Sequence, residues 1–214
     1  MPKPSTLITS AAMLRFLCLV LFCALPITAA AEAKRTLLVF GDSLSAGFGI
    51  AVNQSWPALL QRKLDVEQRP YAVANASISG ETTAGGRSRF DAAMKEFKPA
   101  VVIIELGAND GLRGLPVAAM EDNLNAMIRV AQTAHAKVLL VGMRLPPNYG
   151  PDYTAAFEGA FAHIARQRRT ALLPFLLAPI VGDPASFQND GLHPIAEAQP
   201  RLMEHVWKSL APLL

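Results

Sequence analysis

The sequence predicts an α/β protein in which helices cover both faces of a parallel β-sheet. Short apolar runs alternate along the chain with longer amphipathic stretches. Such alternation is the pattern of βαβ units, which place successive strands side by side in one parallel sheet. The run 101–105 (VVIIE) is apolar at successive positions, so we expect it to be buried on both faces. These observations predict a three-layer α/β/α sandwich.

The first expected strand is 36–40, which reads TLLVF. A helix follows at 56–64, with Ser55 as a plausible N-cap and Pro57 in the first turn, where a missing N–H costs nothing. A weaker strand is expected at 71–74 because its apolar run is short. This part of the chain therefore predicts one βαβ unit.

The middle of the chain repeats this order. A second helix closes over 90–97, and Pro99 ends it because proline cannot continue a helix. The strand 101–105 follows, rich in β-branched residues. The next helix opens at Pro116 and runs to about residue 134, since its apolar residues recur at three- and four-residue spacing.

The last third adds two strands and two helices. The run 137–141 (KVLLV) predicts the fourth strand, and 152–167 predicts a helix with one apolar face. A short fifth strand is expected at 171–173, and the last helix at 196–210. No internal repeat, linker or low-complexity tract interrupts this order.

The N-terminus has the pattern of a secretory signal peptide. Lys3 and Arg15 precede the short apolar stretch 16–27, and small residues follow it. A membrane-spanning helix needs about 20 apolar residues, and this stretch is shorter and contains Pro26. We therefore expect a cleaved leader rather than a membrane anchor.

Cleavage is expected after Ala31 or Ala33, so residues 1–33 form the signal peptide and residues 34–214 a single domain. The mature protein is expected to be periplasmic or secreted, without a stable membrane anchor. Both cysteines lie in the leader, so the mature chain cannot form an internal disulfide.

The net charge of +3 is a small excess spread over the chain. The densest basic run, 166–169, falls near an expected helix end, where it complements the helix dipole and is solvated. We expect no nucleic-acid partner. The oligomeric state is open, with a monomer favoured.

Polar loops follow each expected strand. Because ligands bind outside the carboxyl ends of parallel strands, we expect these loops to converge on one edge of the sheet. The loops are 41–45 (GDSLS), 75–83 (NASISGETT), 106–111 (LGANDG), 144–150 (RLPPNYG) and 190–194 (DGLHP).

Three residues in these loops have the chemistry of a serine hydrolase. Ser43 is the candidate nucleophile, His193 the candidate base, and Asp190 the carboxylate that orients the imidazole. Taken singly, Ser43 is also a common turn serine, and Asp190 is also part of an Asp-Gly turn. The other three histidines, His135, His163 and His205, fall on or beside expected helices, where a solvated surface position is expected.

Gly80 and Asn109 are candidate oxyanion donors, with the Ser43 amide as a third. A glycine offers a backbone N–H that substrate approaches closely, and an asparagine offers its amide. Each is also an ordinary turn or cap residue when taken alone. No metal site is expected, because the histidines are scattered and have no close His or Cys partner. No cofactor is implied.

At four of these blocks the sequence resembles the SGNH (GDSL) hydrolase superfamily. The blocks are 41–44 (GDSL), Gly80, 107–110 (GAND) and 190–194 (DGLHP). Further stretches, including 75–80 (NASISG) and the 144–150 loop (RLPPNYG), look like the branch of small periplasmic acyl-CoA thioesterases, lysophospholipases and arylesterases.

The resemblance implies a flavodoxin-like fold with five parallel strands in the order 2-1-3-4-5. It implies a Ser43–His193–Asp190 triad and an oxyanion hole formed by Ser43, Gly80 and Asn109. The loop with Leu145 and Pro146 would border the groove for the acyl chain, and Leu112 would add an apolar side chain that lines the groove or packs beneath it.

The implied activity is hydrolysis of acyl esters or thioesters, such as aryl esters, acyl-CoA or lysophospholipids, through an acyl-enzyme. The partner would be this small-molecule substrate. Two alternatives remain. One is a carbohydrate O-acetylesterase. Many exposed aromatic residues would favour sugar binding, and the sequence has only two tryptophans. The other is a non-catalytic binding protein on the same fold.

Overall fold

A five-stranded parallel sheet in the order β2-β1-β3-β4-β5 forms the centre of the domain, which confirms the expected fold and strand order. The computed structural model describes residue 1 and residues 33–214, so nearly all of the expected signal peptide lies outside the described residues. The strands are β1 (Arg35–Gly41), β2 (Tyr71–Asn75), β3 (Val101–Glu105), β4 (Lys137–Val141) and β5 (Ala171–Leu173).

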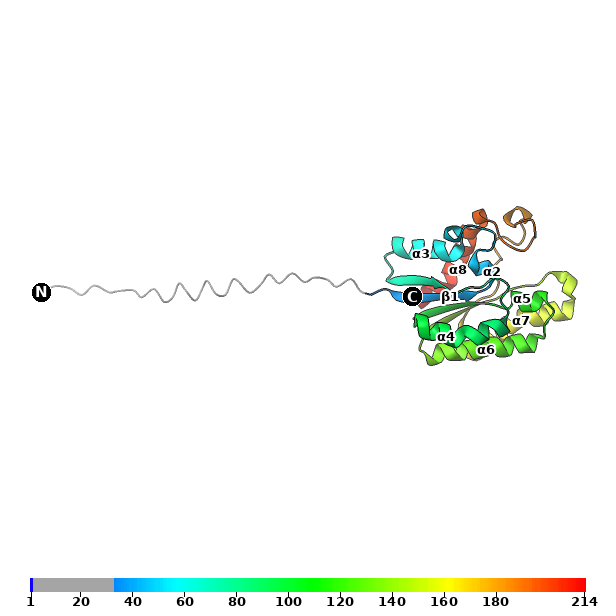
Figure 1. Cartoon of the computed structure of the whole chain (residues 1–214), viewed down its shortest axis with the longest axis horizontal. Coiled ribbons are helices and arrows are strands. Elements are labelled where there is room, and N and C mark those ends of the chain that lie inside the picture. The colour runs from blue at the N-terminus through cyan, green and yellow to red at the C-terminus, as the bar shows by residue number, and fades with distance from the viewer. Residues whose placement is uncertain (2–32) are drawn as a thin grey trace. The chain divides into compact units, whose positions relative to one another are not determined.

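Helices cover both faces of this sheet (Figure 1). The helices α3 and α8 pack together on one face, and α4, α6 and α7 pack side by side on the other. The short helices α2 and α5 lie at the edge toward which the strands point (Figure 1). The helices are α2 (Ser43–Ala46), α3 (Trp56–Val66), α4 (Thr83–Phe97), α5 (Ala108–Leu112), α6 (Val117–Thr133), α7 (Pro151–Arg168) and α8 (Gln199–Leu210).

The core lies between the sheet and the two helix layers. Residues 37–40 of β1 and 101–104 of β3 are fully buried, as the continuous apolar runs of these central strands predict. Trp56 of α3 and Phe157 of α7 are buried on opposite faces of the sheet. Within residues 33–214, no helix combines the length and the apolar character that crossing a bilayer requires.

Two helix starts differ from the sequence expectation. Ser55 occupies the N-cap position of α3, but its hydroxyl donates to the Val52 carbonyl at 2.7 Å and does not cap the helix. The side-chain oxygen of Gln199 instead accepts from the Trp56 N–H at 2.9 Å. The expected helix at 196–210 is a 3₁₀ turn over Ala196–Ala198 followed by α8, in which Pro200 stands in the first turn.

Candidate functional site

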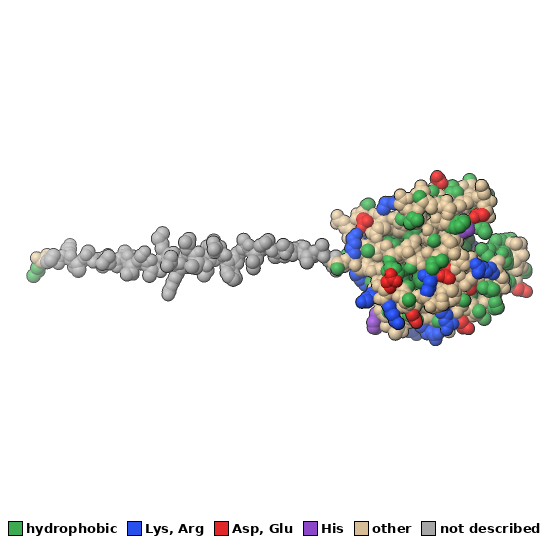
Figure 2. Space-filling model, viewed as in Figure 1, with side chains coloured by type: hydrophobic (Ala, Val, Ile, Leu, Met, Phe, Trp, Pro, Cys, Tyr) green, Lys and Arg blue, Asp and Glu red, His purple; other side chains and the backbone are tan. Residues whose placement is uncertain are grey.

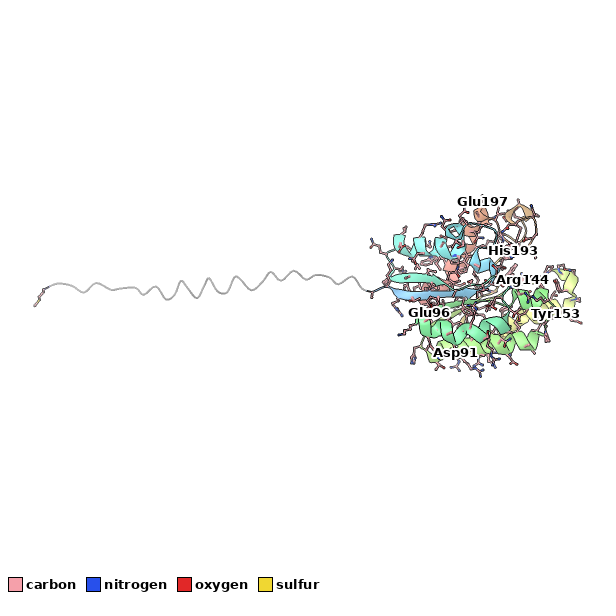
Figure 3. The ribbon with its side chains drawn as sticks, viewed as in Figure 1. Asp91, Glu96, Arg144, Tyr153, His193 and Glu197 are labelled. Carbon is pink, nitrogen blue, oxygen red and sulfur yellow. The ribbon has the colours of Figure 1, made fainter. Side chains whose placement is uncertain are left out.

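A cavity of about 870 Å³ opens at the carboxyl edge of the sheet, where the loops that follow the strands converge. Figure 2 shows the domain hollowed at this end, with a histidine and several hydrophobic side chains around the notch. In Figure 3, His193 and Arg144 lie at this end, whereas Glu96 lies toward the opposite end. Seven of the eight predicted site residues line the cavity, and the eighth, Asp190, lies beside His193 without lining it.

Ser43 is held at the turn between β1 and α2. Asp42 caps α2 by accepting from the Leu44 N–H at 3.0 Å, and Gly47 ends the helix with a positive φ of 78°. Gly41 must lack a side chain, because a Cβ there would lie 2.7 Å from Oε2 of Glu105. This tight packing fixes the turn that presents the Ser43 hydroxyl to the cavity.

Ser43, His193 and Asp190 form one hydrogen-bonded chain. His193 Nε2 lies 2.9 Å from Ser43 Oγ, and His193 Nδ1 lies 2.7 Å from Asp190 Oδ2. The other oxygen of Asp190 accepts from the backbone N–H groups of Leu192 and His193 at 2.9 and 3.0 Å. These bonds, with that from the His193 backbone largest, lower the pKa of Asp190 to about 2. The carboxylate is therefore ionised at neutral pH, and its bond to Nδ1 can hold the imidazole in one orientation.

Two residues that the sequence did not single out hold the imidazole in place. The ring of Phe48 packs beside His193 with the ring centroids 4.5 Å apart. The side-chain amide of Gln188 donates to the Phe48 carbonyl at 2.8 Å, and the Gln188 backbone N–H donates to the His193 carbonyl at 2.7 Å. Gln188 thus ties the loop after β1 to the loop that carries His193.

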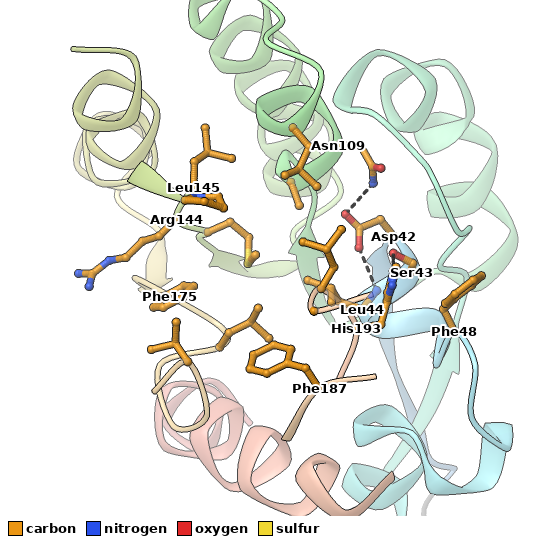
Figure 4. Close-up of a pocket in the computed structure, with 18 of the residues that line it drawn as sticks. Asp42, Ser43, Leu44, Phe48, Asn109, Arg144, Leu145, Phe175, Phe187 and His193 are labelled. Atoms are coloured by element: carbon orange, nitrogen blue, oxygen red, sulfur yellow. Dashed lines mark hydrogen bonds between the residues drawn. The ribbon is translucent and has the colours of Figure 1, made fainter. Parts of the chain in front are cut away.

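Asn109 and Asp42 lie beside Ser43, on the side of the cavity away from Arg144 and Phe175 (Figure 4). The Asn109 amide donates to Asp42 Oδ2 at 3.1 Å, which fixes the orientation of the amide. Asp42 is fully buried, and burial raises its pKa to about 6. The amide of Asn109 has a second N–H, so it can donate to a ligand while it remains bonded to Asp42.

A second buried carboxyl, Glu105, lies beneath this pair. Glu105 Oε2 accepts from Ser45 Oγ at 2.7 Å and from the Asp42 N–H at 3.4 Å. Its other oxygen is buried without a hydrogen-bond partner among the described residues. Burial, reinforced by the charge of Asp42, raises the pKa of Glu105 well above its ordinary value. The last residue of strand β3 is thus a buried acid with a raised pKa, and it lies under the turn that carries Ser43.

Gly80 lies in the loop after β2 and lines the cavity. Its φ of 79° is in the left-handed region, which favours glycine. Its carbonyl accepts from the Arg113 guanidinium at 3.0 Å, and this bond helps to fix the orientation of the Gly80 carbonyl. The loop after β3 therefore supports the loop after β2.

The rest of the cavity wall is largely apolar. Leu145 and Pro146 line it, as the resemblance implied, and so does Leu112, which was expected either to line the groove or to pack. Apolar residues that sequence reasoning did not assign to the site also line this wall, among them Met143, Phe175, Leu177 and Phe187. No local pattern distinguishes these residues from ordinary core positions, since they gather only when the loops fold together.

The surface position expected for His205 is wrong. His205 is half-buried on α8, and its Nε2 lies 3.0 Å from the Phe175 carbonyl. The bond holds the segment after β5 from which Phe175 reaches the cavity. At the outer rim, the Arg144 guanidinium points away from Ser43 (Figure 4), pairs with Glu158 at 2.7 Å and stacks over the Phe175 ring.

Within residues 33–214, no three side chains of His, Cys, Asp or Glu gather as metal ligands. The polar groups that line the cavity include a hydroxyl, an imidazole and amide donors, which suit acyl transfer.

Comparison with known proteins places this geometry in a family. The GDSL-like Lipase/Acylhydrolase family matches residues 39–199, well over half of the chain. The chain belongs to this family. Esterase TesA of Pseudomonas aeruginosa is 52% identical over 182 residues, which cover 85% of this chain and 90% of that protein.

Two further proteins give the same assignment. Thioesterase 1/protease 1/lysophospholipase L1 of Escherichia coli K12 is 41% identical over 188 residues, which cover 88% of this chain and 89% of that protein. A crystal structure of TesA superposes with a TM-score of 0.82 at 52% identity, and the match covers 84% of this chain and 100% of that chain. The predictions of the family, the fold and a carboxylic ester hydrolase are confirmed.

Proposed function

We propose that this family member is a serine esterase and thioesterase in which Ser43 is the nucleophile, His193 the general base and Asp190 the carboxylate that orients it. The observation that carries the proposal is the 2.9 Å contact between Ser43 Oγ and His193 Nε2 inside a cavity of about 870 Å³. A serine hydroxyl becomes a useful nucleophile only when a base accepts its proton, and this contact provides the base.

The reaction proceeds in two steps. His193 takes the Ser43 proton while Ser43 Oγ attacks the ester or thioester carbonyl, and the protonated imidazole then gives that proton to the departing alcohol or thiol. Water attacks the resulting acyl-serine, again losing a proton to His193. The free acid leaves, and Ser43 recovers its proton from the imidazolium.

Charge on the tetrahedral intermediate falls on the former carbonyl oxygen. The Ser43 and Gly80 backbone amides and the Asn109 side chain are the donors for it, and each such donor is worth about 3–4 kcal/mol in a dry site. Asp42 supports this role because its bond to Nδ2 holds the Asn109 amide in one orientation before substrate arrives.

The substrate we propose is an ester or thioester with an apolar acyl chain. Leu112, Leu145 and Pro146 form part of the wall that would receive the chain. The names of the relatives, esterase and thioesterase/lysophospholipase, agree with this class. A carbohydrate O-acetylesterase is less well supported, because sugar hydroxyls would meet mostly apolar side chains in this cavity.

We also propose that the enzyme acts after export, in the periplasm or outside the cell, as the N-terminal pattern indicates. A monomer suffices, because one chain supplies every group in the proposed mechanism.

The test replaces the nucleophile. Ser43→Ala should abolish hydrolysis of p-nitrophenyl butyrate and labelling by a fluorophosphonate probe, while circular dichroism and the melting temperature stay near wild type. Ser88→Ala is the matched control, because Ser88 is an exposed helical serine whose hydroxyl donates to the Gly85 carbonyl, and this variant should keep both hydrolysis and labelling. Wild-type turnover by Ser43→Ala would rule out the proposal.

A further inference from the structure

Exposed apolar side chains gather around the mouth of the cavity. The large hydrophobic residues exposed on the described domain are Phe48, Val52, Val66, Ile78, Leu115, Val181 and Leu192. All except Val66 lie in segments that connect the end of a strand to the next long helix. Such segments lie at the carboxyl edge of a parallel sheet. The large apolar side chains that this domain exposes are therefore concentrated at the edge where the cavity opens.

This rim is continuous with the interior of the cavity. Phe48, Val181 and Leu192 are exposed to solvent and also line the cavity. Ile78 and Leu115 lie farther out and do not line it, with exposed fractions of 50% and 38%. An acyl chain that approaches from outside can thus remain against apolar side chains from the rim to the nucleophile. Exposed apolar patches of this kind mark surfaces that meet a partner.

The charges indicate what kind of surface the rim meets. Within residues 33–214, every lysine lies outside the connections that form the rim. Lys63, Lys95 and Lys208 are in the last turns of their helices, and Lys34 and Lys137 are at the starts of strands. The lysines therefore favour the opposite edge of the domain. An anionic membrane attracts basic residues, so it would draw that edge toward itself and turn the mouth away.

We propose that the rim docks the enzyme, mouth first, onto the surface of a zwitterionic lipid aggregate such as a lysophosphatidylcholine micelle, from which an acyl chain passes directly into the cavity. The apolar rim side chains enter the interface, and no lysine of residues 33–214 needs to be desolvated there. The two rim arginines are already engaged, Arg113 with the Gly80 carbonyl and Arg144 with Glu158.

The test uses the full chain and two sets of variants. The double variant Ile78→Ser/Leu115→Ser removes apolar surface from the rim without touching the cavity wall. Val66→Ser is the matched control, since Val66 is 82% exposed at the end of α3, on the opposite edge. Every variant carries the same N-terminal residues, so differences between variants report on the rim alone.

Binding is measured by sedimentation with vesicles of phosphatidylcholine, and with vesicles that also contain phosphatidylglycerol. The double variant should bind phosphatidylcholine vesicles at least about tenfold more weakly than wild type, the loss expected for withdrawing about one exposed apolar side chain from the interface. Val66→Ser should bind like wild type. Equal binding by all three proteins, no binding by wild type, or binding that requires phosphatidylglycerol and disappears in high salt would each overturn the proposal.

The kinetic measurements rest on the proposed ester hydrolysis, whereas vesicle binding does not. A failure of the docking proposal can therefore be told apart from a failure of the proposed hydrolysis. On soluble p-nitrophenyl butyrate the double variant should match wild type. On lysophosphatidylcholine its rate should match wild type below the critical micelle concentration and fall about tenfold above it. If the double variant is impaired on p-nitrophenyl butyrate, Val52→Ser replaces it, because Val52 is a rim residue that does not line the cavity. Equal rates above the critical micelle concentration would contradict docking.

Discussion

At the residue scale, two carboxyls of the site lie in opposite environments. Asp190 is 38% exposed on its side chain and accepts three hydrogen bonds, which lower its pKa. Glu105 is fully buried, and desolvation raises its pKa. Hydrogen bonds to the charged form and burial act in opposite directions on the same chemical group. Each carboxyl therefore gives a different prediction.

Asp190→Asn should lower kcat on p-nitrophenyl butyrate by about 10²–10⁴-fold. The asparagine oxygen can keep the bonds from the Leu192 and His193 backbones, but its NH₂ faces His193 Nδ1. That contact favours the tautomer with the proton on Nε2, which can no longer accept from Ser43. Because the pKa of Asp190 is about 2, the loss should appear at every pH from about 5 to 9. Asp91→Asn is the control, because Asp91 is an exposed residue of α4, and it should leave kcat unchanged. A kcat near wild type for Asp190→Asn would contradict an orienting role.

Glu105→Gln tests the buried acid through stability. The folded state raises the pKa of Glu105, so folding takes up a proton. The stabilising contribution of this group is fully present below the ordinary value of 4.5 and is lost as the pH rises toward the folded-state pKa. Glutamine has no such dependence. The stability of the variant relative to wild type should therefore rise from pH 5 to 8 by up to about 1.4 kcal/mol per pH unit.

Urea unfolding at both pH values measures this difference in the free energy of unfolding. Asp42 contributes to the wild-type slope in the same direction, since burial raises its pKa to about 6. Because the charge of Asp42 also acts on Glu105, the difference between variant and wild type reports the titration of Glu105 beside Asp42. Parallel stability curves for Glu105→Gln and wild type would show that Glu105 titrates normally.

At the element scale, two helical glycines differ in what surrounds them. A Cβ on Gly86 of α4 would lie 2.5 Å from Cδ1 of the fully buried Leu106 and 3.4 Å from the ring of Phe40. A Cβ on Gly159 of α7 would meet nothing within 4 Å. Gly86 lets α4 lie close to the sheet, whereas no neighbouring atom requires a glycine at position 159.

Gly159→Ala should therefore raise the free energy of unfolding by about 0.5–1 kcal/mol, the helix preference of alanine over glycine. Gly86→Ala gains the same preference but overpacks the core, which costs about 1–3 kcal/mol. Thermal and urea unfolding of the two variants should rank Gly159→Ala above wild type and Gly86→Ala below it. A stabilised Gly86→Ala would mean that Leu106 moves aside freely.

The same elements show what the sequence could predict. Strands β3, β4 and β5 have the predicted bounds, because runs of apolar residues between polar loops define buried strands. The start of α4 at Thr83 was not apparent, because two glycines follow in its first turn and weaken the helical pattern. The Thr82 hydroxyl and the bond from the Thr83 N–H to Asp110 stabilise this end.

The candidate site was predicted where its chemistry is local and missed where it depends on distant partners. Asp190 and His193 are three residues apart, so their pairing follows from the sequence. The bonds of Gln199 to Trp56 and of His205 to Phe175 join segments far apart in the chain. Glu105 ends an apolar strand and is the one charged residue there, but only the fold shows that it lies beneath Asp42.

At the scale of the whole molecule, the domain has two different edges. The loops of the carboxyl edge carry the site and its apolar rim, whereas the lysines favour the amino edge. Strand β1 begins at this amino edge and pairs with both β2 and β3, so it cannot be shortened without opening the sheet. The fold therefore constrains where the proposed signal peptide can be cut.

Signal cleavage should leave β1 intact. Arg35 is its first residue and donates its N–H to the Pro70 carbonyl at 2.7 Å, and Lys34 pairs with Asp65 at 2.7 Å. Mass spectrometry of the exported protein should show Glu32 or Lys34 as the first residue, because cleavage after Ala31 or Ala33 spares every strand contact. The processed chain contains no cysteine, so its melting temperature should be the same with and without a reducing agent. A protein that begins beyond Arg35, or that retains the leader after export, would contradict this processing.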